Sequence, residues 1–298
     1  MVRQYKIHTN LDGTDDKVWD VTNGKVRFYQ PSNLGLKSTN NIWQSNGIGV
    51  MGTRSIPQPQ IEFKLETFGE SLEENYRLMK DFVNDILSKK FVTLEYQTEI
   101  FQVYADLALA DVTKTEGYGK NGTFSEKITF DIITKWYTYE TLTLEMIQNG
   151  KVIAGKSKIY GGTAPGYYKY IEGVSYTYYG ETNIERLSRW DIKDEIFSFM
   201  GILYPQLPKT PTGVRFLDDI GNEYTAIVFK TEELQDYILI NTDVNDETYQ
   251  GWKGTTALNL FPVMDFERYR TRIIKKGQME LINLSKAEFK VKRKADFV

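Results

Sequence analysis

The sequence predicts a mainly β fold that carries one amphipathic helix. Gln60 to Phe68 alternates apolar and charged residues, as a strand with one buried face does. Val103 to Thr115 and Ser125 to Lys135 are two β-rich runs joined by a glycine-rich turn, which is typical of a β-hairpin. Ser71 to Lys89, by contrast, repeats its apolar residues at helical spacing.

The first part of the chain predicts short strands and one long connecting segment. Asn23-Gly24 separates two short β-rich runs, and Asn-Gly is a strong hairpin signal. Pro31 to Pro59 is rich in Gly, Asn, Ser and Pro, and a segment this long inside a compact domain is usually functional or disordered. This segment fits two interpretations: a β-hairpin or belt that docks on a neighbouring subunit, or a plain flexible loop.

A helix is predicted at about residues 71–89. Ser71 and Glu74 have the spacing of a capping box, which satisfies the first free amides of a helix. The apolar residues that follow define one face, and Glu73, Lys80 and two aspartates lie opposite. We expect this helix to cover a core, and we expect Phe91 to Tyr96 to follow it as a strand.

The length of 298 residues suggests about two domains. We place the first at residues 1–138, ending at Trp136-Tyr137, and the second at residues 139–298. The sequence of the second domain predicts short strands with turn residues between them, and this pattern suggests an antiparallel β-sandwich. Within it, Glu185 to Met200 is ambiguous between a short helix and a strand.

A tyrosine-dense stretch in the second domain is the candidate binding surface. Gly and Ser interleave the rings, and this composition is typical of adaptable binding surfaces because Tyr gives a large contact area for little entropy lost. Alternatively, the rings pack a small core of their own. The candidate partner-binding residues are Tyr167, Tyr168, Tyr170, Tyr176, Tyr178 and Tyr179.

Composition argues against an enzyme and against a metal protein. The chain has no Cys, which excludes disulfides, thiolate metal sites and Cys nucleophiles. Its one His, His8, is expected to be an exposed strand residue. Asp12 to Asp16 lacks the spacing of an EF-hand loop and is predicted to be a turn. We therefore expect no catalytic residue, no metal ligand and no cofactor.

Charge and hydropathy argue against nucleic-acid and membrane partners. The net charge is −3, so the overall charge does not attract the chain to nucleic acid, and we expect no sequence-specific nucleic-acid partner. The basic run Lys286 to Lys294 is expected to be a solvated last strand. No stretch approaches the ~20 apolar residues of a membrane span, and the start has no apolar signal-peptide core. We expect a protein that is made in the cytoplasm and is not exported.

Carbohydrate binding is the alternative that the aromatic content favours. Five Trp and 20 Tyr on a β-sandwich offer rings that stack against sugars. Trp252 lies between Gly251 and Gly254, and this predicts a loop that displays the indole. The competing interpretation is that Trp252 plugs the end of the sandwich.

Several motifs occur in the order found in siphophage distal tail proteins, and the chain resembles this family. The resemblance covers most of the chain and is strongest over about residues 25–140. It looks closest to the distal tail proteins of lactococcal siphophages. The motifs are Leu34-Gly35-Leu36, Arg54, the helix from Ser71, the strand from Phe91 to Tyr96, and the run from Lys114-Thr115-Glu116 through Trp136-Tyr137.

The resemblance implies the structural hub of a phage tail tip or baseplate. Such proteins form hexameric rings through a β-sandwich-like first domain, about residues 1–138 here. The ring joins the tail tube to the tail-tip protein, and DNA passes through its lumen. The implied location is the virion, after synthesis in the host cytoplasm.

The resemblance also implies a second domain like galectins and carbohydrate-binding modules. No His follows His8, so the His-bearing sugar motif of galectins is missing and lectin activity is in doubt. The second domain is longer than a plain sandwich, and the surplus coincides with about residues 148–194. We infer an arm-like insertion there. In lactococcal relatives such an extension grips the receptor-binding protein.

Overall fold

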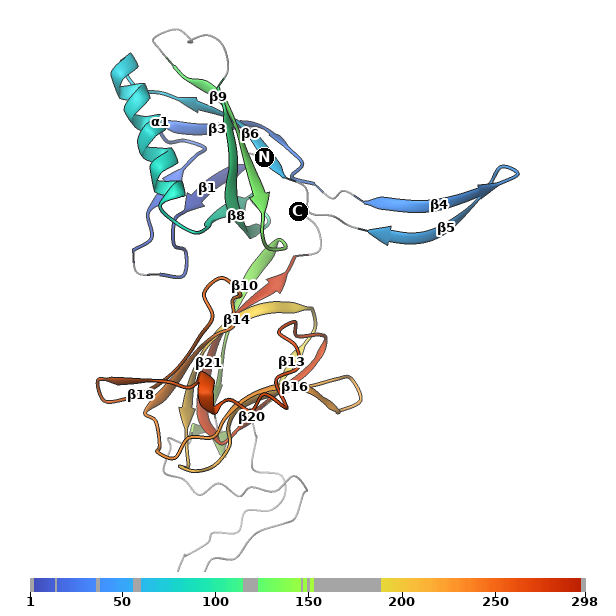
Figure 1. Ribbon diagram of the computed structural model, residues 1–298, viewed down its shortest axis with the longest axis vertical. Coiled ribbons are helices and arrows are strands. Elements are labelled where there is room, and N and C mark those ends of the chain that lie inside the picture. The colour runs from blue at the N-terminus through green and yellow to red at the C-terminus, as the bar shows by residue number, and fades with distance from the viewer. Residues whose placement is uncertain are drawn as a thin grey trace, which may run out of the picture. The chain divides into compact units, whose positions relative to one another are not determined.

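The chain folds as two compact units (Figure 1). Unit 1 comprises Met1–Thr138 together with Lys294–Val298, and unit 2 comprises Tyr139–Arg293. The structure is a computed structural model. It describes residues 3–13, 15–35, 38–55, 60–114, 123–145, 147–148, 151–152 and 189–295. Within these ranges the fold is mainly β with one α-helix, so the predicted fold class is confirmed.

Unit 1 is built on one curled antiparallel sheet with strand order β2-β1-β7-β8-β9-β6-β3. β8 pairs with β7 from Gln102 to Leu107 and with β9 from Leu107 to Thr113, so this long strand changes partner along its length. Phe28 N donates to Val21 O at 2.7 Å, which joins the two ends of the strand order. The strands are β1 Gln4–His8, β2 Val18–Asp20, β3 Val26–Ser32, β6 Ile61–Thr67, β7 Val92–Gln97, β8 Gln102–Thr113 and β9 Ser125–Ile132.

The helix α1, Leu72–Leu87, packs on this sheet and begins at the predicted cap. Ser71 Oγ accepts a hydrogen bond from Glu74 N at 3.2 Å. Glu74 Oε2 in turn accepts from Glu70 N at 2.7 Å, so the reciprocal contact of the capping box is shifted by one residue. The fully buried ring of Phe82 meets Phe28 edge to face, and this contact anchors the helix in the core of unit 1.

The segment Pro31 to Pro59 contains a β-hairpin, β4 Thr39–Ser45 and β5 Ile48–Ser55. Its turn residues Asn46 and Gly47 both take positive φ, 50° and 81°, as a type I′ hairpin turn requires. The two strands form a separate two-stranded sheet. The predicted hairpin is therefore confirmed and the plain loop is wrong, while docking of the hairpin on a neighbouring subunit stays a prediction.

Unit 2 is a sandwich of two antiparallel sheets, as the sequence predicts. One sheet has the order β10-β21-β14-β17-β18-β19 and the other β13-β20-β15-β16. Phe199 of β14 contacts Phe216 of β15 with ring centroids 5.9 Å apart, so the core lies between the sheets.

The strands of unit 2 are as follows. The larger sheet contains β10 Tyr137–Glu145, β14 Ile196–Pro205, β17 Tyr237–Asn241, β18 Thr248–Lys253, β19 Thr256–Asn259 and β21 Leu284–Lys294. The smaller contains β13 Arg189–Ile192, β15 Thr212–Leu217, β16 Glu223–Phe229 and β20 Gly277–Ile282. A short pair, β11 Ile147–Gln148 and β12 Lys151–Val152, and the 3₁₀ helix η2 Phe261–Val263 complete it.

Two sequence predictions need correction or completion in unit 2. The ambiguous stretch from Glu185 to Met200 forms strands β13 and the start of β14 in its described part. The basic run at the end lies on β21, but Lys292 is not solvated. It is 4% exposed and its ammonium lies 2.8 Å from Asp243 Oδ2, because a buried charge requires an opposite one nearby.

Candidate assembly site

The β4–β5 hairpin presents uncovered apolar side chains. Every residue of both strands is exposed. Trp43 is 69% exposed and Ile48 71% exposed, so most of the surface of each side chain is in contact with solvent. The apolar residues of this hairpin surface are Ile42, Trp43, Ile48, Val50 and Met51.

Both faces of the hairpin are apolar. Trp43 pairs with Val50, and Ile42 pairs with Met51 at the next register position. Neighbouring positions on a strand point to opposite faces, so the two pairs lie on different sides of the ribbon. An isolated two-stranded hairpin is marginally stable in water, and exposed apolar patches mark interaction sites. The hairpin surface is therefore suited to pack against another chain.

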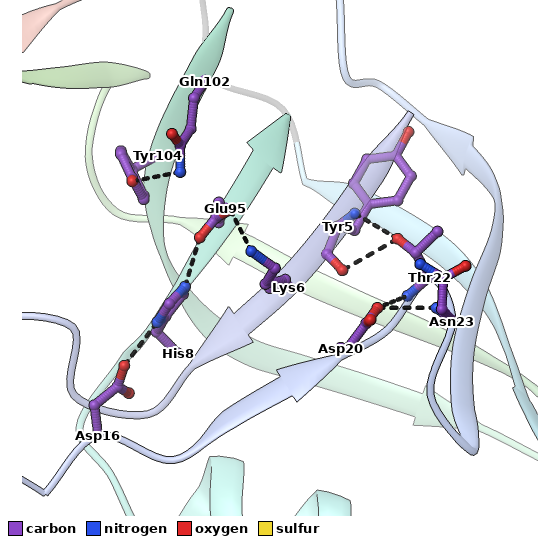
Figure 2. A network of polar contacts seen from close by, with 10 residues as sticks. All are labelled: Tyr5, Lys6, His8, Asp16, Asp20, Thr22, Asn23, Glu95, Gln102 and Tyr104. Atoms are coloured by element: carbon purple, nitrogen blue, oxygen red, sulfur yellow. Dashed lines mark hydrogen bonds and ion pairs between the residues drawn. The ribbon is translucent and has the colours of Figure 1, made fainter. Parts of the chain in front are cut away.

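A polar network in unit 1 surrounds the one histidine (Figure 2). His8 Nδ1 lies 2.7 Å from Asp16 Oδ2, and His8 Nε2 lies 2.8 Å from Glu95 Oε2. Glu95 Oε1 also accepts a hydrogen bond from Lys6 Nζ at 2.8 Å. His8 is 8% exposed, so the expectation of an exposed strand residue is wrong.

The network engages every nitrogen of the imidazole. Because both ring nitrogens contact carboxylates, neither is free to bind a metal or to act as a base on a substrate. Burial alone would raise the pKa of Glu95, but the hydrogen bonds and charges of Lys6 and His8 lower it on balance. The network is therefore a set of internal polar contacts and not a catalytic constellation.

The sequence did not reveal the partners of His8, and Asp16 is one of them. Asp12 to Asp16 lies in the connection between β1 and β2, where Gly13 N donates to Asn10 O at 2.9 Å as in a turn. A turn was predicted here, but the contact of Asp16 with His8 was not. No group of three His, Cys, Asp or Glu side chains suited to a metal ion occurs in the part of the chain that the structure describes.

Trp252 lies within a strand and not in a display loop. It belongs to β18, opposite Tyr237 on β17, and the two rings stack with centroids 6.0 Å apart. The indole is half-buried. Both interpretations of Trp252, the displayed ring and the plug at the end of the sandwich, assumed a loop and need correction.

The predicted tyrosine surface and most of the predicted insertion lie outside the described residues. This holds for Tyr167, Tyr168, Tyr170, Tyr176, Tyr178 and Tyr179. The glycine-rich turn at 115–122 lies outside them too. None of the helices in the described ranges has the length and apolar character needed to cross a membrane.

Family models match both halves of the chain. The N-terminal domain of distal tail proteins matches residues 4–133, and the C-terminal domain of Dit matches residues 135–298. The distal tail protein of Lactococcus phage p2 is 93% identical to this chain, and that of Lactococcus phage SK1 is 91% identical. Each alignment spans 298 residues and the whole of both chains.

Solved structures agree with the family models. A chain in the structure of the phage p2 baseplate in its activated conformation with Ca is 93% identical, covers all of both chains and has a TM-score of 0.81. The Dit protein of SPP1 is 11% identical, with a TM-score of 0.52 over 98% of this chain and 99% of that one. The SPP1 likeness shows the fold alone.

The exposed apolar hairpin β4–β5 is typical of a protein that assembles with other chains. The contacts that occupy both nitrogens of His8 fit a structural role. The family models and the relatives show which class of assembly protein this is. The chain belongs to the family of phage distal tail proteins, the Dit family, so the resemblance seen in the sequence is confirmed. It is a structural component of the phage tail, and this indicates a role without catalysis. The alternative of a separate carbohydrate-binding module protein is not favoured.

Proposed function

We propose that this chain is the hub of a phage baseplate and forms a homo-oligomeric ring, expected to be a hexamer. The ring connects the tail tube to the tail-tip protein and leaves a lumen for DNA. The observation that carries the proposal is the hairpin surface of β4 and β5, which exposes Trp43 and Ile48. The presence of the 93% identical p2 relative in a baseplate supports it.

The hairpin surface has the chemistry of a ring interface. A heterologous contact joins a donor surface on each copy to an acceptor surface on the next, and it closes into a ring when the rotation between neighbouring copies permits closure. A two-stranded ribbon has two free edges, and a neighbouring chain can add to either by β-augmentation. Permanent interfaces also bury more apolar area than transient ones do. Apolar side chains on both faces of the ribbon meet this requirement.

The first test is the mass of the purified chain. Light scattering behind size exclusion, with negative-stain images of the same peak, should give about six times 34.6 kDa and a ring with a central hole. A monomer that persists even when the tail tube and tail-tip proteins are added would contradict the proposal. Rings of another copy number would keep the hub and change the stoichiometry.

Polar substitution of the hairpin surface should prevent the ring from closing. The triple variant Trp43→Ser, Ile48→Ser and Val50→Thr removes apolar area that we place at the contact, and these exposed side chains add little to the fold of unit 1. We expect a monomer on size exclusion with an unchanged melting temperature. Ile220→Ser, at an 83% exposed position in unit 2, is the control and should leave the ring intact. If the triple variant still forms rings, the interface lies elsewhere.

We further propose that the insertion at about residues 148–194 holds the receptor-binding protein. The support is its composition, because Tyr167, Tyr168 and the other predicted tyrosines form a contact-rich set. Deletion of Gly155 to Thr182 should abolish binding of receptor-binding protein while the ring mass stays that of the truncated oligomer. Unchanged affinity in surface plasmon resonance would remove the insertion from this role. Trp252→Ala, which alters unit 2 outside the insertion, is the matched control.

A further inference from the structure

The contacts of His8 with Asp16 and Glu95 join three segments of unit 1. His8 ends β1, Asp16 lies in the connection to β2, and Glu95 lies on β7 (Figure 2). The His8 side chain is 10% exposed and that of Glu95 is 5% exposed. Water therefore cannot readily replace these contacts, and their state depends on the groups themselves.

The two contacts require a proton count that a neutral histidine does not meet. A neutral imidazole has one N–H donor and one lone pair, whereas an ionised carboxylate only accepts. Both His8 nitrogens are within 2.8 Å of a carboxylate oxygen. Either the imidazole carries both protons or one carboxyl is protonated. Glu95 also accepts a hydrogen bond from the Lys6 ammonium, which favours the ionised carboxylate and therefore the doubly protonated imidazole.

We propose that the second proton on His8 clamps the connection from Thr9 to Lys17 onto β7, so that this connection is held while the imidazolium persists and is released when it deprotonates. Loss of that proton leaves a lone pair facing a carboxylate at hydrogen-bond distance. The lone pair and the carboxylate oxygen are both acceptors and make no hydrogen bond with each other. Of the two carboxylates, that of Asp16 lies in a connection between strands and that of Glu95 lies on a strand, so Asp16 is the one that can move away. The inference rests on unit 1 alone and is independent of the hub proposal.

Asp16 is the residue on which the order of this connection depends. Its Oδ1 accepts from Asn10 N at 2.9 Å while its Oδ2 contacts His8. Lys17 N donates to Thr9 Oγ1 at 2.9 Å and closes the same loop. Removal of the His8 contact therefore frees one of the two oxygens that hold the loop in place.

The connection also reaches the helix. Lys89, just after α1, lies 2.9 Å from Asp15, and Lys17 binds Asp85 on α1. These pairs lie at the surface, where solvent and salt screen the charges, so each contributes little to stability. They are too weak to hold the connection alone, but they couple its order to the end of the helix. Release of the clamp is thus expected to loosen the contact between the connection and α1.

The other groups around His8 do not supply a second proton donor. On β2 its register partner is Val18, and on β7 it is Thr93, whose hydroxyl donates to Asp106 at 2.7 Å. From β8, Tyr104 lies near Glu95, and burial followed by the charge of Glu95 raises the pKa of this phenol. Lys6 is already bound to Glu95. The second proton of the clamp therefore lies on His8.

At low pH the clamp depends on the ionisation of Glu95, and it is lost as the pH falls. The folded-state pKa of Glu95 is depressed, so its stabilising contribution is present above the pKa of an unfolded glutamate, about 4.3, and is lost as the pH falls through the lower folded value. The clamp consequently operates in a pH window. Its lower limit is protonation of the carboxylate, and its upper limit is deprotonation of the imidazole.

His8 is the one histidine in the sequence, so a histidine signal can be attributed to it without further assignment. Hydrogen exchange at the imidazole C2 position, followed by mass spectrometry of the intact protein across pH, reports the deprotonation of His8 directly. Backbone amide exchange of peptides covering residues 9–17, corrected for its intrinsic pH dependence, reports release of the connection. We expect amide protection to fall over the same pH range in which His8 deprotonates.

Variants separate the clamp from general stability. Asp16→Asn keeps the shape but removes one charge, and should lower the pH midpoint of His8 deprotonation because the imidazolium loses a negatively charged partner. His8→Gln should make the protection of residues 9–17 independent of pH across that range. Asp20→Asn is the control, because Asp20 accepts from Thr22 N and Asn23 N and does not touch His8.

Two results would overturn the inference. One is a wild-type connection whose protection stays constant while His8 deprotonates. The other is an Asp16→Asn variant with an unchanged His8 midpoint and a far-ultraviolet circular dichroism spectrum that shows it folded. If Asp16→Asn fails to fold, Glu95→Gln replaces it, and the same downward shift of the midpoint is required.

Discussion

Gly213→Ala is expected to lower the free energy of unfolding of unit 2 by about 3 kcal/mol or more, from backbone strain and overpacking together. Gly213 takes a φ of +154°, a conformation that residues with a Cβ rarely adopt. A Cβ built there would lie 1.9 Å from the carbonyl oxygen of Ile227. That oxygen belongs to the backbone of β16, the strand paired with β15, so it cannot rotate away as a side chain would.

The measurement is urea unfolding followed by hydrogen exchange, because exchange resolves peptides of unit 2 from those of unit 1. Gly254→Ala is the matched control. Gly254 also has a positive φ, +58°, but a Cβ there would meet no atom within 4 Å. The control should cost about 1 kcal/mol, from the backbone conformation alone. Equal losses for the two variants would show that the approach of β15 to β16 is not the cause.

Phe63→Ala should destabilise unit 1 by about 3–5 kcal/mol, the range for deletion of a buried aromatic ring. Phe63 is 1% exposed on β6. Its ring stacks on Phe28 with centroids 4.6 Å apart and meets Tyr5 edge to face at 5.5 Å. Because Phe28 also contacts Phe82 of α1, the cavity would loosen the packing of the helix.

The same urea titration, monitored in peptides of β6 and α1, measures this loss. Phe63→Leu keeps most of the apolar volume and should cost less than half as much. A loss below about 1 kcal/mol in Phe63→Ala would mean that the neighbouring rings close the cavity. Peptides of β15 and β20 should be unaffected, because those strands belong to the core of unit 2.

Periodic segments were predictable from the sequence because their pattern and their environment agree. β6 alternates strictly and is buried on every second residue. The cap at Ser71 is a local interaction, so it is legible in four residues. The hairpin β4–β5 left two interpretations open because both of its faces are exposed, and no alternation of polar and apolar residues then marks a strand.

The contacts that were missed depend on distant partners. His8 is buried because β7 lies beside β1, and Glu95 is 87 residues away in sequence. Gly251 suggested a loop, yet it is a strand residue. A Cβ there would lie 2.8 Å from Gln235 Oε1, so glycine serves close packing and not a turn. Lys292 continues a basic run in the sequence, while its charge is matched by Asp243.

Unit 1 includes residues from both ends of the chain, and this bears on how the two units could be exchanged during evolution. Ala295 N donates to Trp136 O at 2.8 Å, so the polypeptide leaves unit 1 and returns to it at neighbouring points. Unit 2 is thus one continuous segment, a cassette inserted in the sequence between the two parts of unit 1. A single proteolytic nick between the units would not release it. Recombination could exchange the whole cassette for any domain whose termini lie equally close, and leave the parent unit intact.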